Sequence, residues 1–323
     1  MRFFRGADRW PRPRRHEGGG MRVLVTGARG FIGTALVPAL EAAGHTVRGV
    51  GRGVHPVVKD WRRADLTAPE SLAGVCDACE AVIHLAGVAH TRAGAHEHEA
   101  VTVAGTRALI AEARAARVAQ FIFVSSIKVE CARDAYAASR RMGEDMVRAC
   151  GLPSVAIVRP ALVYGPGMRG NLNRLLRMAD LSWPLPIPPG GARRSLVHCD
   201  DLARVLVALL AQRARDALYT VTDGASYTMR DIYDLMRAAV GRPAARYALP
   251  EGVVPAVARF GDWMTRLTGR RWPWNSDGLA PLLASCTSDD RRVWEDLGMV
   301  PAYTLASGIA AMVAARGGRG ERS

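Results

Sequence analysis

Three glycines, Gly27, Gly30 and Gly33, stand at three-residue spacing directly after an apolar run, Val23 to Val25. Because glycine has no side chain, this spacing leaves bare backbone that a pyrophosphate can approach. The N–H groups and the positive end of a following helix would then hold its charge. The chemistry indicated is the binding of phosphates rather than bond breaking by the glycines themselves.

The sequence around the glycines supplies the context that such a site needs. Helical spacing follows from Thr34 to Ala43, and a second strand-like run spans His45 to Val50. A strand, a glycine turn, a helix and a second strand favour a dinucleotide site over a glycine-rich turn without a ligand.

Residues after the second strand help to distinguish a site for NADP from one for NAD. Many sites carry an acidic residue there to hold the ribose hydroxyls, whereas this chain has Arg52. A guanidinium suits a 2′-phosphate, which favours NADP over NAD. Asp65 and Leu66 would lie over the adenine, and the alternative role for Asp65 is an ordinary cap for a helix over Ala68 to Val75.

Strand-like and helical segments alternate along the first half of the chain. This alternation predicts an α/β fold with a Rossmann-type, doubly wound parallel sheet, whose ligands bind at the carboxyl ends of the strands. The further strands are expected at Pro56 to Lys59, Ala81 to Gly87, Phe121 to Val124 and Val155 to Val158, and the helices at Glu99 to Ala116 and Tyr136 to Cys150.

The later sequence is less regular and predicts a smaller, mostly helical substrate domain. We expect a leader without structure over residues 1–20, a dinucleotide-binding domain over 21–165 and a substrate-binding region over 166–323. Segment 196–224 is expected to return to the first domain. Thr228 and Asp231 are spaced as a capping box for a helix, and Tyr247 to Leu283 predicts a lid or small helical subdomain.

Composition restricts the class of protein. The 323 residues are 49% hydrophobic and 23% charged, as in globular proteins, and no apolar run has the length of a membrane span. The expected location is the cytoplasm, without membrane insertion.

The formal charge of +14 includes six arginines in the first twenty residues, and no basic run interleaved with aromatics follows. Nucleic acid is therefore not an expected partner.

Possible metal ligands do not converge in the sequence. Cys76 and Cys79 form a lone CxxC pair, and His90, His96 and His98 lie in a polar segment. A zinc site needs further ligands at suitable spacing, so no metal is predicted.

Taken in order, these motifs resemble the extended short-chain dehydrogenase/reductases of the NAD-dependent epimerase/dehydratase family. The resemblance covers Met21 to about Gly308. It rests on Thr26-Gly27-x-x-Gly30-x-x-Gly33, His84-Leu85-Ala86-Gly87, Val124-Ser125-Ser126, Tyr136 with Arg140, Arg159-Pro160, Val163-Tyr164-Gly165-Pro166-Gly167, and the late Asp289 and Leu297-Gly298.

The resemblance implies roles for individual residues. Tyr136 would carry a proton, Ser126 would orient the substrate oxygen and Arg140 would supply positive charge, because a phenol transfers protons more readily when its phenolate is stabilised. The implied cofactor contacts are made by Gly27, Arg29, Gly30, Phe31, Ile32, Gly33, Arg52, Asp65, Leu66, Leu85, Ala86, Gly87, Tyr136, Arg140, Pro160 and Val163.

Further segments resemble a branch of this family that acts on UDP-N-acetylhexosamines in surface-polysaccharide synthesis. By this resemblance Ser126, Asn171, Leu172 and Arg194 bind substrate, with Asn171 and Arg194 on the diphosphate. The implied activity is C4 epimerisation or 4-ketoreduction of a nucleotide-activated sugar with NADP or NAD. A homodimer through the helices at Glu99 to Ala116 and Tyr136 to Cys150 is also implied.

Three departures from the family pattern keep other functions open. Arg140 replaces a lysine, Thr102 stands in Val-Thr-Val where Val-Asn-Val is usual, and only nine residues separate Ser126 from Tyr136. A guanidinium has fixed geometry and keeps its proton. One alternative is therefore a cofactor-binding sensor or scaffold with impaired catalysis, and another is a reductase of a sterol-like or other apolar alcohol.

Overall fold

The computed structural model describes residues 19–53, 57–87, 99–168, 170–188, 190–213, 216–245, 247, 250–269, 272, 275–276, 285–288 and 290–320. The chain forms two compact units. The first unit comprises Met1–Pro160, Cys199–Val221 and Arg292–Val300, and the second comprises Ala161–His198, Thr222–Arg291 and Pro301–Ser323. The sequence had placed the division at residue 165 and the return at 196–224, without the third segment.

A seven-stranded parallel sheet forms the centre of the first unit, with the strand order β3-β2-β1-β4-β5-β6-β9. The strands are β1 (Arg22–Thr26), β2 (Thr46–Gly51), β3 (Asp60–Arg63), β4 (Ala81–His84), β5 (Gln120–Val124), β6 (Ser154–Pro160) and β9 (Ala217–Val221). The chain reverses its winding direction between β1 and β4. Such a switch point lies beside the carboxyl ends of the strands, where doubly wound folds bind ligands.

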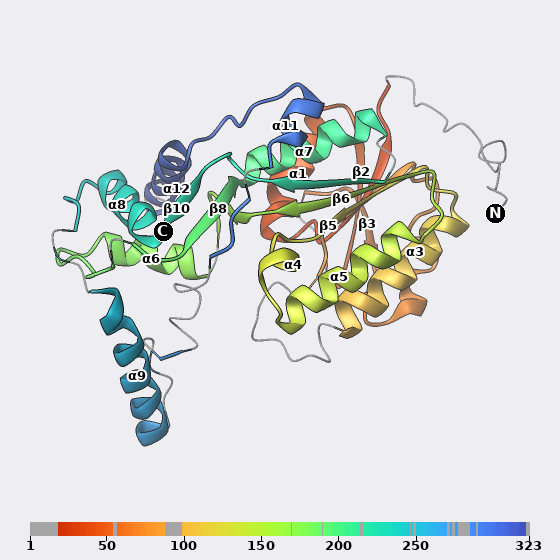
Figure 1. Ribbon diagram of the computed structural model, residues 1–323. Helices are drawn as coiled ribbons and strands as arrows, with labels where there is room; N and C mark the ends of the chain where they lie inside the picture. Colours follow the sequence, from red (N-terminus) through yellow and green to blue (C-terminus); the bar gives the residue numbers. More distant parts are fainter. Residues whose placement is uncertain are drawn as a thin grey trace. The chain divides into compact units, whose positions relative to one another are not determined.

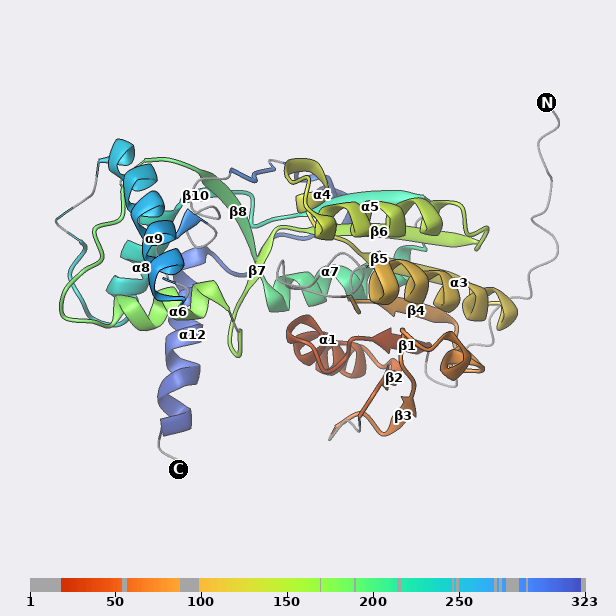
Figure 2. The same cartoon turned by 90° about the horizontal axis from the view of Figure 1, so that it is seen from below.

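Helices cover both faces of this sheet, as Figures 1 and 2 show. On one face α1 (Phe31–Ala42) packs on α7 (Cys199–Gln212), and on the other α3 (Gly105–Ala115) packs on α5 (Ala135–Arg148). Shorter elements are the 3-10 turn η2 (Pro69–Leu72), the π-helical segment η3 (Glu99–Ala104), α4 (Lys128–Cys131) and α11 (Arg292–Leu297). Because both faces are covered, β1 and β5 are apolar in succession rather than alternating, with Val23 to Val25 and Phe121 to Phe123 fully buried.

One buried carboxylate joins α5 to the ends of two strands. Glu144 of α5 has no solvent exposure and accepts a 2.6 Å hydrogen bond from Ser125 Oγ, just after β5. Arg159 of β6 contacts both oxygens of the same carboxylate, through Nε at 2.8 Å and Nη2 at 2.6 Å. Arg159 also reaches Glu130 of α4 at 2.8 Å. This cluster fixes α5 against the carboxyl edge of the sheet.

The second unit combines helices with a three-stranded sheet of order β10-β8-β7. Its elements are β7 (Leu162–Tyr164), α6 (Asn171–Ala179), β8 (Arg193–His198), β10 (Ser226–Thr228), α8 (Met229–Ala239), η4 (Glu251–Val253), α9 (Val254–Thr268) and α12 (Leu305–Gly320). The predicted capping box of Thr228 and Asp231 is confirmed at the start of α8. Arg237 is buried and donates hydrogen bonds to the carbonyls of Ala179, Leu181 and Pro243, which ties α6 to α8.

The strand predicted at Pro56 to Lys59 is displaced, since β3 spans Asp60–Arg63. Two long-range contacts explain the shift. Asp60 pairs with the buried Arg48 of β2 at 2.9 Å, and Trp61 packs where Gly49 lacks a side chain, because a Cβ there would lie 2.4 Å from its ring. Neither contact is visible in the local pattern of residues.

Two predicted helices also differ from the structure. Only the short turn η2 forms within Ala68 to Val75, where Gly74 adopts a positive φ of 69°. The helix predicted over Glu99 to Ala116 begins as the π-helical segment η3, and regular α-helix starts at Gly105. A Cβ at Gly105 would approach the Cβ of Leu66 to 2.7 Å, so the glycine allows this close contact.

The Glu144 cluster gives a prediction for stability. Replacing Glu144 by Ala leaves Arg159 half-paired and Ser125 without its acceptor, which should cost about 3 to 5 kcal/mol of unfolding free energy, since a buried charge loses its partner. The matched control is Asp145→Ala. Asp145 pairs with Arg148 on the same helix but is 68% exposed, so its loss should cost less than about 1 kcal/mol. Urea denaturation measures both, and equal losses would contradict this account.

Candidate cofactor and catalytic site

The glycine turn between β1 and α1 is packed too closely to hold side chains. Gly27 has a positive φ of 71°, and a Cβ there would lie 3.0 Å from the Ala86 nitrogen. A Cβ on Gly33 would meet the Ala28 carbonyl oxygen at 2.4 Å. The chain thus brings bare backbone of β1, α1 and the segment after β4 together at the carboxyl edge of the sheet.

The N-terminus of α1 is built to receive an anion. Gly30 is the N-cap and makes no side-chain capping hydrogen bond. The first-turn N–H groups at Phe31, Ile32 and Gly33 have no acceptor within a helix, because those acceptors would precede it. The free N–H groups and the positive end of the helix dipole therefore point to the same space beside the glycines, which carry no side chains. This arrangement fits a pyrophosphate.

Cationic residues flank the end of β2. Arg52 is exposed. The guanidinium of Arg29 lies close to Gly53, because a Cβ added to Gly53 would be 2.5 Å from Nη1 of Arg29. Asp65 accepts hydrogen bonds from the backbone N–H and hydroxyl of Thr67, which lower the pKa of its carboxyl, with a smaller contribution from the charge of Arg52. Asp65 is thereby held as a carboxylate in a turn, next to the half-buried Leu66.

Beneath the glycine turn, a buried histidine joins β1 to β4 and α3. His84 has one ring nitrogen 2.5 Å from Thr26 Oγ1 and the other 2.9 Å from Thr106 Oγ1. Thr26 Oγ1 also accepts a hydrogen bond from the Ala86 N–H. Burial, with a smaller contribution from the nearby charge of Arg140, lowers the pKa of His84 to about 3. This neutral imidazole fixes the start of Leu85-Ala86-Gly87.

Tyr136 and Arg140 lie one turn apart on α5, which places them on the same side of the helix. The Arg140 guanidinium carbon is 5.5 Å from the centre of the Tyr136 ring. Lys128 Nζ, from α4, also lies 5.5 Å from that centre. Two cations therefore flank the half-buried phenol, although the sequence predicted only one.

Arg140 is a buried cation at the strand ends. Its Nη1 donates a 3.0 Å hydrogen bond to the Val124 carbonyl at the end of β5, and its Nη2 lies against Gly87. Among the described residues no carboxylate pairs with it, and its buried Nε has no hydrogen-bond partner. Burying an unpaired charge is costly, so the site fits polar groups of a ligand that would complete these hydrogen bonds.

The short segment between Ser126 and Tyr136 is an ordered connection. Ser126 Oγ accepts from the Lys128 N–H at 3.3 Å at the start of α4, and Asp134 caps α5 by accepting from the Ala137 N–H at 2.8 Å. Lys128 and Asp134 lie 3.9 Å apart as an ion pair. Short though it is, the connection holds Lys128 beside Tyr136.

The remaining predicted residues lie on separate elements. Pro160 ends β6 in the first unit. In the second unit Val163 lies in β7, and Asn171 is exposed at the start of α6, whereas Leu172 is buried in the core of that unit. Arg194 lies in β8, where burial lowers the pKa of its guanidinium below the ordinary value.

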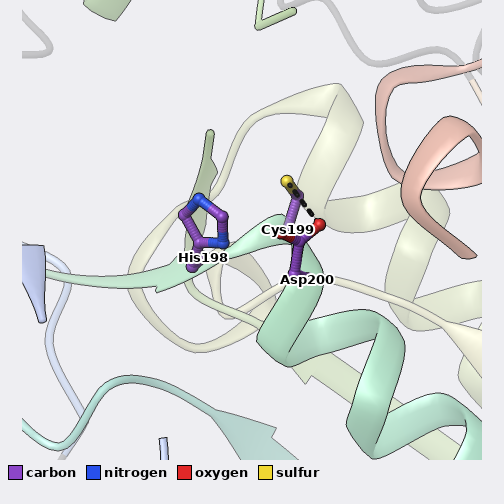
Figure 3. Close-up of side chains that lie close together, drawn as sticks. All are labelled: His198, Cys199 and Asp200. Atoms are coloured by element: carbon purple, nitrogen blue, oxygen red, sulfur yellow. Dashed lines mark hydrogen bonds between the residues drawn. The ribbon is translucent and has the colours of Figure 1, made fainter. Parts of the chain in front are cut away.

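Metal-ligating side chains cluster at one place among the described residues, at His198, Cys199 and Asp200 (Figure 3). The three are consecutive, so their proximity follows from the chain itself. The Cys199 thiol donates to the Asp200 carboxylate at 3.6 Å, and the His198 ring stacks on Tyr303 with centroids 3.8 Å apart. His90, His96 and His98 lie outside the described residues. Burial raises the pKa of the Cys76 thiol, and that of Cys79 to about 11.

A comparison with protein-family models matches residues 23–221 to the NAD dependent epimerase/dehydratase family. The chain belongs to this family. Its members are NAD-dependent epimerases, dehydratases and reductases, and the glycine turn, the buried Arg140 and the parallel sheet described above all lie within the matched residues.

Relatives within the NAD dependent epimerase/dehydratase family differ in substrate. A ceramide reductase of Caulobacter vibrioides is 40% identical over 193 residues, which span 58% of this chain and 60% of that protein. A UDP-glucose 4-epimerase of Vibrio cholerae is 27% identical over 89% of this chain and 93% of that protein. The solved dTDP-glucose 4,6-dehydratase of Streptomyces venezuelae, which holds NAD, shares the fold with a TM-score of 0.72 at 22% identity, over 93% of this chain and 98% of that one.

Sequence reasoning missed the residues that support this family's site. Glu144 was not identified, and Lys128 was not predicted to lie beside Tyr136, because a glutamate or lysine on a helix usually faces solvent. His84 was recognised only as part of the His84-Leu85-Ala86-Gly87 motif, without its role in joining β1 to β4 and α3. The one signal that could have pointed to Glu144 was its spacing from Arg140 and Tyr136 in the sequence. Glu144 lies four residues after Arg140 and eight after Tyr136, which puts it on the same face of α5.

His84 gives a prediction for pH dependence. The folded protein keeps this imidazole neutral down to about pH 3, whereas in the unfolded chain it takes up a proton below about 6.5. Stability is therefore lost as pH falls from 6.5 towards 3, by about 2 kcal/mol at pH 5 for this group alone. His84→Gln should remove that share of the loss between pH 7 and pH 5 in urea denaturation. His45→Gln, a less buried histidine, is the control and should leave most of the loss in place. An unchanged pH dependence in His84→Gln would contradict this account.

Proposed function

We propose that the protein is an NAD(P)-dependent oxidoreductase that interconverts a carbonyl and a secondary alcohol on a long-chain lipid. The reaction type rests on one observation, the closeness of both Arg140 and Lys128 to the ring of Tyr136. The substrate class is supported by the ceramide reductase, whose identity of 40% exceeds the 27% of the UDP-glucose 4-epimerase.

The reaction needs a hydride and a proton delivered to two neighbouring atoms. When bound, a reduced nicotinamide supplies the hydride to the carbonyl carbon. The Tyr136 hydroxyl donates its proton to the carbonyl oxygen, so that the C=O bond becomes an alcohol and the side chain becomes a phenolate. Solvent returns the proton before the next cycle, and alcohol oxidation reverses each of these transfers.

The neighbours of Tyr136 make this transfer favourable. Arg140 and Lys128 stabilise the phenolate, because a cation beside the ring lowers the energy of its negative charge. The Ser126 hydroxyl orients the carbonyl oxygen by donating a hydrogen bond. Arg140 also has a donor, Nε, without a hydrogen-bond partner among the described residues, and we propose that its guanidinium donates to the ribose hydroxyls beside the nicotinamide without exchanging a proton.

We further propose that NADP is preferred over NAD. Arg52 at the end of β2 is exposed, and Arg29 lies next to Gly53 in the same loop. Two guanidinium groups there would attract a 2′-phosphate, and the usual acid for the ribose hydroxyls is replaced by arginine.

A second candidate function is C4 chemistry on a nucleotide-activated sugar, as an epimerase or 4-ketoreductase in surface-polysaccharide synthesis. The UDP-glucose 4-epimerase relative covers nearly the whole chain, which favours it. Asn171, Leu172 and Arg194 would then bind substrate, with the guanidinium of Arg194 meeting the diphosphate.

A cofactor-binding sensor or scaffold of impaired activity is the remaining alternative. Thr102 has a buried hydroxyl without a hydrogen-bond partner among the described residues, where the family has asparagine. Arg140 nevertheless stays close to Tyr136, which favours turnover over a purely binding role.

A homodimer in the cytoplasm remains part of the proposal. The helices α3 and α5 would form its interface, since alanine-rich faces permit close helix packing. Nucleic acid is not an expected partner. Within the described part of the chain, none of the helices combines the length and apolarity that crossing a bilayer requires.

Turnover by the purified full chain tests the proposal. We expect NADPH-dependent reduction of a long-chain 3-oxo lipid in detergent micelles, slower turnover with NADH, and little turnover of UDP-glucose or UDP-N-acetylglucosamine. Tyr136→Phe should lower kcat by about 10²- to 10⁴-fold, because the proton donor is lost, and should affect NADPH binding far less than kcat. Tyr247→Phe, an exposed tyrosine, serves as the control and should retain full activity.

Other outcomes separate the candidates. Turnover of a UDP-sugar without turnover of the lipid would favour the second function. NADPH binding without any turnover, in the wild type and in Arg140→Lys alike, would favour the sensor. Equal activity of Tyr136→Phe and wild type would contradict the assigned chemistry in every case.

A further inference from the structure

An exposed apolar stripe runs along α9 in the second unit. Phe260 and Trp263 are each 55% exposed and Leu267 is 65% exposed, although aromatic and aliphatic side chains of this size are usually buried. Their spacing of three and four residues places them on one face of the helix. The same spacing extends back to the exposed Ala256 and Val253. We call these five residues the α9 stripe.

The opposite side of α9 contacts the segment that directly follows the helix. Ala258 and Gly261 are buried, and Asp262 accepts two hydrogen bonds from Ser276, at 2.9 and 2.6 Å. Thr265 Oγ1 accepts from the Trp272 N–H at 3.1 Å. The α9 stripe is therefore the exposed face of a helix whose other face is covered by the segment that follows it. Figure 1 shows α9 extending away from α6, α8 and α12.

The aromatic side chains of the stripe support one another in this exposed position. The Phe260 ring lies 5.8 Å from Trp263 and meets Trp272 edge-on at 6.4 Å. Such contacts fix the rings without covering them. An apolar cluster held open in this way marks a contact surface more often than a chance arrangement.

One edge of the stripe is positively charged. Arg259 and Arg266 are exposed and lie seven residues apart, so they follow each other along the same side of α9. The acidic residue of this helix, Asp262, is engaged by Ser276. Aromatic and leucine side chains with arginines along one border are the composition of helices that lie in a membrane interface.

We propose that α9 docks the protein on an anionic lipid bilayer, with the α9 stripe inserted at the headgroup boundary and Arg259 and Arg266 against lipid phosphates. Each arginine near such a surface contributes attraction, and tryptophan suits the boundary between headgroups and acyl chains. Charge at this surface favours a bilayer over a second copy of the stripe, since two copies of α9 packed together would bring Arg259 and Arg266 of both chains close to one another.

Docking of this kind would leave the protein peripheral to the membrane. A helix whose opposite face packs on protein inserts only its outer side chains. The inference does not depend on the proposed reaction, although a bilayer is where a long-chain lipid substrate would be found. Vesicle binding and turnover are separate measurements, so either can fail without the other.

Co-sedimentation of the full chain with vesicles tests the inference. We expect binding to vesicles of mixed phosphatidylcholine and phosphatidylglycerol, weaker binding to pure phosphatidylcholine, and weakening by salt. The double variant Phe260→Ala/Trp263→Ala should reduce binding at least about tenfold, which is 1.4 kcal/mol. Arg259→Gln/Arg266→Gln should abolish the preference for the anionic vesicles.

The matched control is Trp183→Ala. Trp183 is 84% exposed and lies in the same unit but outside α9, so its loss should leave binding unchanged. Quenching of wild-type tryptophan fluorescence by brominated lipid is a second readout that needs no variant. Absence of binding and quenching, or equal loss of binding in Trp183→Ala, would overturn the proposal. A dimer in solution that only the α9 double variant dissociates would assign the stripe to a second copy instead.

Discussion

The fully buried carboxylate of Glu144 is the interaction on which the candidate site depends. Tyr136 and Arg140 lie on α5, whereas Ser126 follows β5, so the site exists only if the helix is fixed relative to the strand ends. Glu144 does this by accepting hydrogen bonds from Ser125 and Arg159. Three neighbouring elements thereby share one charge that has no access to water. A displacement of α5 would leave that charge with Arg148 of the same helix at 3.3 Å, without Ser125 and Arg159.

The charged residues around Glu144 differ in whether they have a partner of opposite charge. Glu144 and Arg159 neutralise each other, while Arg140 on the same helix face is buried without a carboxylate among the described residues. His84, close by, stays neutral because of burial and the charge of Arg140. Within the described part of the chain, the charge of Arg140 beside Gly87 and the phenol of Tyr136 is therefore not matched by a carboxylate. A ligand with ribose hydroxyls, or a phenolate formed during turnover, would satisfy it.

The sequence allowed much of the first unit to be predicted, because its signals are local. The apolar runs of β1 and β5 and the glycine turn each depend on residues that are neighbours in the chain, and so does the cap of α8 in the second unit. The position of β3 could not be predicted, since it depends on Arg48 meeting Asp60 and on Trp61 filling the space beside Gly49. Glu144 and Lys128 acquire their roles only when α5 packs on the sheet. The substrate class depends on the shape and chemistry of residues outside the family motifs. Relatives with the same motifs can therefore differ in substrate, as the UDP-glucose 4-epimerase and the ceramide reductase do.

The most direct test of the central claim is a crystal structure of the full chain with NADP⁺ bound. The account predicts the pyrophosphate on the N–H groups at the start of α1, Arg140 donating to the ribose beside the nicotinamide, and the Tyr136 hydroxyl facing the nicotinamide C4. A cofactor bound away from the glycine turn, or a Tyr136 side chain directed away from the nicotinamide with α5 in place, would contradict it.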